Sequence, residues 1–427
     1  MVKRIPKIFY GWWIAIASST MTTYYGGVVY YGFTAFFTPI VNEFGWTRAA
    51  TSFAFSLQRL EGGIVAPIVG YLIDKLGPRK LNLFAVTVGG LGLLLLSQIN
   101  SLLTFYAAFL IISVGQSAGF YTVGATTVAN WFVRNRGKAM GFLTGGVCLA
   151  GTLVPVLVWL IHSYGWRWAL VIAGLGMWVI GIPLSLVLRH RPEQYGLLPD
   201  GDDSKKHVSV QSIMGKKDDS DKLPHTAPSQ PVSTETDFTV WEAIKTRSFW
   251  LLSLGSSISY MAMSAVFVHV MPFLESIGFN RDKASLVVTF IILLSVLGRV
   301  GLSWLSDFMD KRYVFCMAIG LQVIGLIIFA NIRTLWHVIP FLLTFSPGYG
   351  ALIPLRPAIQ GAYFGRKHFG TIQGFYMSIS TVFSMTGPPF AGWIFDMTES
   401  YRLAFIILAA TTAIGVPLLL AATPPKR

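Results

Sequence analysis

The sequence predicts an all-α integral membrane protein with twelve transmembrane helices in two six-helix bundles. Two observations predict this fold class. Hydrophobic residues make up 53% of the 427 residues and charged residues only 12%, about half of what a soluble domain carries. In addition, twelve apolar runs approach the roughly 20 residues that a helix needs to cross a bilayer core. The composition excludes a soluble enzyme, a secreted disulfide-bonded protein and a disordered protein.

Six apolar runs occupy residues 1–188, which we expect to form an N-terminal bundle. The first run resembles a signal peptide, because it follows a basic segment and contains the cleavage-like sequence Ala15-Ile16-Ala17. The hydrophobic stretch continues far beyond that sequence, so we expect an uncleaved first helix. The predicted spans of this half are 10–36, 47–73, 81–99, 102–129, 139–162 and 167–188.

A polar stretch separates the two sets of helices. Residues 189–246 are rich in Ser, Asp, Lys and Pro and hold ten of the nineteen acidic residues. This composition is typical of a disordered linker, and we expect a solvated hinge, with a regulatory role as the alternative. Residues 247–427 are expected to form the C-terminal bundle, with spans at 248–271, 284–306, 313–330, 336–362, 370–394 and 401–421.

Lysine and arginine are distributed unevenly over the predicted loops. Twelve helices place both termini on one side, and the short segments on that side hold fifteen of the 33 basic residues, against six on the opposite side. Cytoplasmic loops carry such an excess. We therefore expect a multi-pass protein of the inner (plasma) membrane with cytoplasmic termini and linker. The net charge of +14 then follows from topology and requires no nucleic-acid partner.

The two halves are related by an internal repeat. Residues that mark helix ends recur at an offset of about 233, which chance explains poorly. An even number of helices in each half makes the repeats parallel, and parallel repeats suggest two bundles that rock about a site at their interface. The matched pairs include Gly45 and Gly278, Arg48 and Arg281, Asp74 and Asp307, Arg79 and Arg312, and Pro155 and Pro388.

One loop motif carries a resemblance to a known family. The segment Gly70-Tyr-Leu-Ile-Asp-Lys-Leu-Gly-Pro-Arg-Lys80 resembles the signature between helices 2 and 3 of the major facilitator superfamily, and residues 303–312 hold a degenerate copy. Asn130-Trp-Phe followed by Arg136-Gly-Lys-Ala is similar to bacterial monocarboxylate porters and oxalate/formate antiporters. The resemblance covers the chain outside the linker and implies a major facilitator fold and secondary transport.

The resemblance also implies a gate at the cytoplasmic side. In the family, the charges of this loop help to latch the two bundles together in one state. The residues that occupy these positions here are Asp74, Arg79, Asp307 and Arg312.

Four charged residues lie at membrane depth, away from the ends of the predicted helices: Arg59, Glu61, Arg299 and Arg356. Such residues cost several kcal/mol at membrane depth and are functional candidates by default. Their surplus of positive charge favours an anionic substrate. Arg59 and Glu61 are two residues apart and point to different sides of one helix, so we do not expect them to pair. Arg59 shares its face with small residues, which favours a structural role between helices.

Arg299 is the strongest candidate for substrate binding. It shares a polar helix face with Ser295, and its planar guanidinium suits a carboxylate. Its position also matches the helix 8 arginine that binds substrate carboxylate in the monocarboxylate carriers. The alternative is an arginine that reaches toward the interface near Asp307.

Further candidates for the substrate site lie in two other helices. Arg356, flanked by prolines, shares a face with Tyr349 and is a possible second anion contact, with a structural pairing as the alternative. Tyr24 and Tyr31 share one face of helix 1, which lines the cavity in this superfamily, and could donate hydrogen bonds to a carboxylate; an aromatic packing seam is the alternative.

Two residues are candidates for proton coupling. Glu61 is the only acid deep in the predicted membrane region and could carry a proton or neutralise an arginine. His269, near the external end of helix 7, could relay protons because imidazole titrates near neutrality, or could serve packing alone.

The sequence also departs from the related carriers. Ser295 stands where animal monocarboxylate carriers have an acid, helix 1 has no lysine, and residues 375–387 lack the helix 11 lysine of oxalate/formate antiporters. These differences argue against proton coupling through the acid and lysine of the animal carriers, and against oxalate exchange.

Together these patterns predict a monomeric secondary transporter of a small organic anion. A monocarboxylate is the first expectation; a dicarboxylate or other small solute and an anion channel are the alternatives. No GxxxxGK[ST] loop for ATP is present, and the two cysteines lie in separate apolar runs. No enzymatic activity, cofactor or metal is expected.

Overall fold

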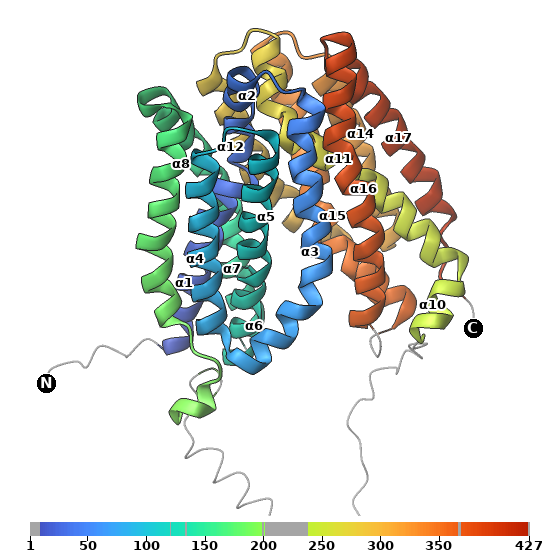
Figure 1. Ribbon diagram of the computed structural model, residues 1–427. Coiled ribbons are helices and arrows are strands. Elements are labelled where there is room, and N and C mark those ends of the chain that lie inside the picture. The colour runs from blue at the N-terminus through green and yellow to red at the C-terminus, as the bar shows by residue number, and fades with distance from the viewer. Residues whose placement is uncertain are drawn as a thin grey trace, which may run out of the picture.

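The structure confirms the predicted all-α membrane architecture. It is a computed structural model that describes residues 9–119, 121–132, 135–198, 200, 238–365 and 369–425. The described part of the chain is helical and contains no strand. The described helices make twelve passes in chain order. The two halves lie side by side (Figure 1).

The first half contains six passes. The first combines α1 (Tyr10–Tyr25), the π-helical turn η1 (Gly26–Tyr30) and α2 (Phe33–Phe44). The fifth and sixth passes share α8, which turns back at Gly165, where the backbone is left-handed with φ of 80°. The other elements are α3 (Arg48–Leu76), α4 (Pro78–Ser97), α5 (Leu102–Ala118), α6 (Tyr121–Trp131), α7 (Arg136–Leu149), η2 (Ala150–Thr152) and α8 (Leu153–Val187).

The second half repeats this pattern. Gly45 ends the first pass and Gly278 follows the seventh, both with positive φ (66° and 91°), as the repeat offset of 233 predicts. A left-handed residue in this position is most often glycine. The elements are α11 (Arg247–Ser276), α12 (Arg281–Leu297), the π-helical turn η5 (Gly298–Leu302), α13 (Ser303–Leu305), α14 (Lys311–Ala330), α15 (Leu335–Phe364), α16 (Phe369–Thr398) and α17 (Arg402–Ala421).

The stretch between the halves is described only at its ends. A short 3₁₀ turn, η3 (Pro192–Tyr195), follows the first half, and α10 (Val240–Lys245) precedes the second. α10 lies inside the stretch expected to be a disordered linker. Its start is a capping box in which Thr239 and Glu242 satisfy each other's backbone N–H groups, a pattern that favours helix. Residues 201–237 lie outside the described residues.

The outer surface of the helices is strongly apolar. Large hydrophobic side chains such as Leu103, Val179 and Trp336 are more than 70% exposed, as expected for side chains that face lipid. Eight helical stretches of the described residues are long and apolar enough to span a membrane; one of them, Lys138–Val187, contains two passes. α3, which carries Arg59 and Glu61, is not among them, because its polar residues lower its mean hydropathy.

Polar contacts fix the helix ends on the side of the molecule away from the termini. We call this side the distal side, and the side where α1 begins and α17 ends the terminal side (Figure 1).

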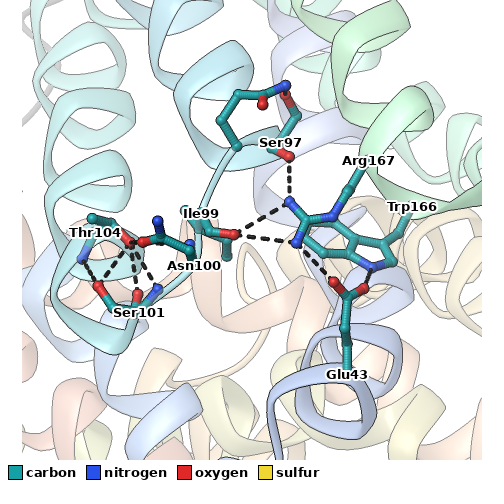
Figure 2. A network of polar contacts seen from close by, with 9 residues as sticks. Glu43, Ser97, Ile99, Asn100, Ser101, Thr104, Trp166 and Arg167 are labelled. Atoms are coloured by element: carbon teal, nitrogen blue, oxygen red, sulfur yellow. Dashed lines mark hydrogen bonds and ion pairs between the residues drawn. The ribbon is translucent and has the colours of Figure 1, made fainter.

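Figure 2 shows Arg167 of α8 bonded to Glu43 of α2 (2.7 Å) and to the carbonyl oxygens of Ser97 (2.7 Å) and Ile99 (3.2 Å). Trp166 also donates to Glu43. One side chain thereby ties three helix ends of the first half together.

Candidate functional site

Two π-helical turns, one from each half, mark the middle of the interface. In η1 the backbone N–H of Tyr31 bonds to the carbonyl oxygen of Gly26, an i→i+5 contact of 2.8 Å. In η5 the π turn contains Arg299. Such turns are rare and are often found at functional sites. Here they carry Tyr30, Tyr31 and Arg299, which all belong to one cluster.

Close helix packing brings Arg299 next to Tyr349. A Cβ atom on Gly298 of η5 would clash with the backbone of Pro347 in α15, and one on Gly350 of α15 would clash with the backbone of Ser295 in α12. The two glycines therefore allow the two backbones to touch. As a result Arg299 lies within electrostatic range of Tyr349, and also of Tyr31 and Cys148 from the other half.

The two halves meet at a pair of tyrosine hydroxyls. The hydroxyl oxygens of Tyr31 and Tyr349 are 3.2 Å apart, and both side chains are buried. Phe267 of α11 packs against both rings, at centroid distances of 5.3 Å and 5.0 Å, and Tyr30 packs edge-on against Tyr31 at 4.9 Å. We call Tyr30, Tyr31, Phe267, Arg299 and Tyr349 the central cluster.

Arg299 has unused hydrogen-bond donors. Its Nε and Nη2 atoms are buried and find no hydrogen-bond partner among the described residues. These two nitrogens form one edge of the guanidinium, and an arginine edge binds the two oxygens of a carboxylate with parallel hydrogen bonds. A buried donor without a partner costs free energy, so an acceptor that reached these nitrogens would stabilise them.

The structure separates Tyr24 from this cluster and gives the hydroxyl of Ser295 a partner in its own helix. The Tyr24 hydroxyl donates to the carbonyl oxygen of Ala173 in α8 (2.7 Å), within the first half. Tyr24 and Tyr31 do not share a face, because the extra residue of η1 rotates the helix by about 100° between them. Ser295 is fully buried and donates to the carbonyl oxygen of Ile292 in its own helix (2.6 Å).

Arg59 and Glu61 contact different neighbours, as their spacing predicts. Arg59 Nη2 donates to the Tyr30 hydroxyl (2.6 Å), so its head group lies at the edge of the central cluster. The Glu61 carboxylate accepts from Ser117 (3.0 Å) and Ser113 of α5, and its Oε1 atom has no partner among the described residues. Glu61 therefore contacts serines of the first half, with no arginine among these partners.

Arg356 lies away from the central cluster, although it shares helix α15 with Tyr349. Seven residues separate the two, which is about 10 Å along a helix. The guanidinium carbon Cζ lies over the rings of Tyr260 and Tyr376, at 4.8 Å and 4.7 Å from the ring centroids. Its Nη2 atom contacts the sulfur of Met377.

The distal side of the interface is sealed by contacts between the halves. The carboxylate of Asp396 in α16 accepts from the backbone N–H groups of Arg48 and Ala49 at the start of α3, both at 2.9 Å. Gly392, one turn before Asp396, lies against the same backbone, where a Cβ atom would clash. The carboxylate thus caps a helix of the other half, where the helix dipole favours negative charge.

Arg48 and Arg281, which the internal repeat relates, each form a hydrogen bond with the opposite half. Arg48 of the first half donates to the Tyr401 hydroxyl (2.7 Å) of the second. Arg281 of the second half donates to the carbonyl oxygen of Ala35 in the first. The internal repeat is thus visible as a reciprocal pair of contacts.

His269 lies inside this seal. It is fully buried and forms hydrogen bonds with Ser52 of the first half (3.1 Å), Tyr401 (3.0 Å) and the carbonyl oxygen of Pro388 (2.9 Å). Its position joins α3, α11, α16 and α17 at one point. A proton-coupling role for His269 stays a prediction.

We expect the Asp396→Ala substitution to weaken the seal. Loss of a helix cap costs about 0.5–2 kcal/mol, which corresponds to a roughly two- to thirty-fold shift in a two-state equilibrium. A cysteine introduced at Thr34, which is buried between the halves, should then react faster with a membrane-impermeant thiol reagent added from the distal side. Glu399→Ala removes a nearby exposed acid and serves as the control; equal labelling rates in both variants would contradict the cap.

The predicted gate residues on the terminal side do not bridge the halves among the described contacts. Arg312 pairs with Asp310 (3.7 Å) and donates to the carbonyl oxygen of Leu420, both in its own half. Arg79 and Asp307 are exposed, and the side chain of Asp74 lies outside the described residues. Every hydrogen bond found between the halves of the described chain lies between the central cluster and the distal end.

Sequence reasoning missed three residues of this interface. Tyr30, Phe267 and Asp396 gave no local signal of their role, since each acts through a contact with a distant segment. The seven-residue spacing of Tyr260 and Phe267 on α11 and of Tyr349 and Arg356 on α15 could have indicated two facing polar and aromatic stripes.

A twelve-helix membrane protein with a polar cluster between two parallel-repeat halves, sealed on one side, has the architecture of a solute carrier. The sequence model of the Major Facilitator Superfamily matches residues 12–355 and 254–427. The chain belongs to this superfamily and is a multi-pass membrane transporter of a small solute, not an enzyme.

Relatives and solved structures agree with this assignment. Monocarboxylate transporter 12-B of Danio rerio is 24% identical over 413 residues, covering 93% of this chain and 84% of the relative. Human monocarboxylate transporter 12 is 24% identical, covering 93% and 78%. Among solved structures, the nucleoside transporter NupG superposes with a TM-score of 0.71 at 14% identity, covering 98% of this chain and all of that one.

A second solved structure gives the same picture of the fold. It is a bacterial homologue of the human lysosomal transporter Spinster, in an inward-facing and occupied conformation. It superposes with a TM-score of 0.72 at 13% identity and covers 96% of each chain. At these identities the structures show the shared fold alone.

Proposed function

We propose that this carrier transports a small organic anion, a monocarboxylate, whose carboxylate binds at Arg299 between the two halves. The observation that carries the proposal is the buried Arg299 guanidinium, which interacts with the Tyr349 hydroxyl close to Tyr31 and whose Nε and Nη2 atoms meet no other close acceptor among the described residues. An arginine edge and two hydroxyls can together satisfy both oxygens of one carboxylate. The names of the relatives, monocarboxylate transporters, support the same substrate class.

Transport would follow alternating access. In the described state the halves are joined on the distal side. We therefore propose that substrate enters and leaves the central cluster from the terminal side in this state. We propose that the terminal side faces the cytoplasm of a plasma membrane, because its loops carry the excess of Lys and Arg. We also propose that Asp74, Arg79, Asp307 and Arg312 join the halves there in the opposite state, and that one chain forms the working unit.

Two modes of coupling fit this site: symport with a proton, and exchange for a second anion. Glu61 is the better-placed proton carrier. Its Oε1 atom has no hydrogen-bond partner among the described residues. It also lies two residues from Arg59, whose head group bonds to Tyr30 of the central cluster. His269, the second candidate, is held by three hydrogen bonds in the distal seal.

The proposal is tested by counterflow in proteoliposomes. Purified protein is reconstituted with unlabelled pyruvate inside, and uptake of labelled pyruvate is measured with and without a pH gradient. We expect accumulation of label that Arg299→Ala abolishes. Acceleration by the gradient would indicate proton symport, and dependence on internal anion would indicate exchange. Uptake of nucleosides, sugars or cations with no response to carboxylates would refute the proposal, and flux without counterflow would indicate a channel.

A further inference from the structure

Arg356 is a buried charge for which the described residues supply no counter-charge. Its side chain is 3% exposed, and it forms no ion pair within the described part of the chain. Burying an unpaired charge costs several kcal/mol, so a buried arginine normally has a carboxylate partner. Its Nε atom also lacks any hydrogen-bond partner among the described residues.

The neighbours of Arg356 stabilise its faces but leave its edges unsatisfied. The Cζ atom of the guanidinium lies over the rings of Tyr260 and Tyr376, and cation–π contacts of this kind favour the charge. The N–H groups point outward in the guanidinium plane and still need acceptors. One turn further along α15, Gln360 is fully buried beside Tyr376, with whose hydroxyl it interacts, and its amide atoms make no other close hydrogen bond among the described residues.

Met377 covers this site. Its sulfur is the acceptor that Arg356 Nη2 contacts, and a thioether is a weak acceptor. The Met377 side chain is 48% exposed, and methionine is flexible, so it can move aside without disturbing the packed core. A carboxylate forms a far stronger, charge-assisted bond with a guanidinium and would displace the sulfur.

We propose that Arg356 and Gln360 form a second anion-binding site, covered by Met377 and placed on the terminal side of the central cluster. α15 runs from the distal to the terminal side, as shown by the contacts of its last turn with residues 238 and 422. Arg356 therefore lies about 10 Å further toward the terminal side than Tyr349. A carboxylate that leaves Arg299 in this state meets Arg356 next, so the cargo has two successive binding positions. This inference rests on the proposed function only in taking the cargo to be an anion.

The site is tested by equilibrium binding of labelled pyruvate to full-length protein in nanodiscs. With Arg299→Ala in the background, we expect weak residual binding that Arg356→Gln removes. In the same background, Met377→Leu keeps the volume but removes the sulfur acceptor, and should tighten binding about three- to tenfold. Met397→Leu, an exposed methionine on the same helix, is the matched control.

Each result separates the second site from the main proposal. Residual binding that is unchanged by Arg356→Gln, or equal affinity in the Met377→Leu and Met397→Leu proteins, would overturn the second site while leaving Arg299 unaffected. If Arg356→Gln does not fold, the comparison of the two methionine variants decides alone. Direct binding of bromide, used as an inorganic probe, should be lost in Arg356→Gln even if the protein binds no carboxylate, in which case the proposed function fails and the second site stands.

Discussion

Replacing Arg299 with alanine is expected to reduce carboxylate binding tenfold or more and to abolish transport. Each charge-assisted hydrogen bond contributes roughly 1.5–3 kcal/mol, and about 1.4 kcal/mol corresponds to a tenfold change in affinity. The Nε and Nη2 atoms of Arg299 supply two such donors. Without them an anion would lose its water between the halves and gain little in return.

The conservative variant refines this expectation. Arg299→Lys keeps the charge but replaces the planar fork with a point ammonium, so binding should fall between that of wild type and Arg299→Ala. Affinity is measured by equilibrium binding of labelled pyruvate to folded protein, with Arg333→Ala on the distal loop as control. If Arg299 instead served a latch with Asp307, Arg299→Ala would change the conformational equilibrium and leave substrate affinity intact. Unchanged affinity would therefore exclude the anion site at Arg299.

The second large effect is expected from Gly298→Ala and Gly350→Ala. At each position an added methyl group would overlap with the backbone of the neighbouring helix, Pro347 or Ser295. Backbone atoms cannot give way as a side chain can, so α12 and α15 must separate. Overpacking of this kind typically costs about 1–3 kcal/mol or more, and the separation also moves Arg299 away from Tyr349.

A neighbouring glycine provides the matched control. Gly301 lies in the same π turn as Gly298, and a Cβ atom there meets no atom within 4 Å. We expect Gly298→Ala and Gly350→Ala to lower both the thermal unfolding midpoint and pyruvate binding, whereas Gly301→Ala should resemble wild type. If all three variants unfolded at the same temperature, the close contact of the two helices would not support the site.

The fold could be predicted from the sequence because its signals are local. Apolar runs of bilayer length define the helices, and glycines such as Gly45 and Gly278 mark equivalent helix ends in the two halves. The capping box at Thr239 is an equally local signal, which shows that the polar stretch before the second half contains a helix.

The site could be predicted only in part. Arg299, Tyr31 and Tyr349 were identifiable as polar groups in apolar helices, and the structure brings them together. Assigning Tyr24 to the same face assumed a regular α-helix, and the inserted residue of η1 changes the phase between Tyr24 and Tyr31. A single i→i+5 turn leaves no recognisable pattern in the sequence.

Contacts between the halves were the least predictable. Asp396 and the start of α3 are 347 and 348 residues apart in the chain, and which side of the interface is joined depends on the conformational state. Repeat symmetry relates Arg48 to Arg281, but does not say that each reaches across to the other half. Those contacts required the three-dimensional arrangement.

The cap formed by Asp396 has a consequence for how this seal can vary among related sequences. Asp396 bonds to main-chain N–H groups of Arg48 and Ala49, which every residue except proline possesses. Substitutions at position 49 can therefore accumulate without loss of the cap, whereas Asp396 and Gly392, which permits the close approach, cannot be exchanged freely. A search for covarying charge pairs would miss this contact, because one partner is the backbone. The contact should instead appear as a Gly-x-x-x-Asp pattern in α16, with no matching pattern in α3.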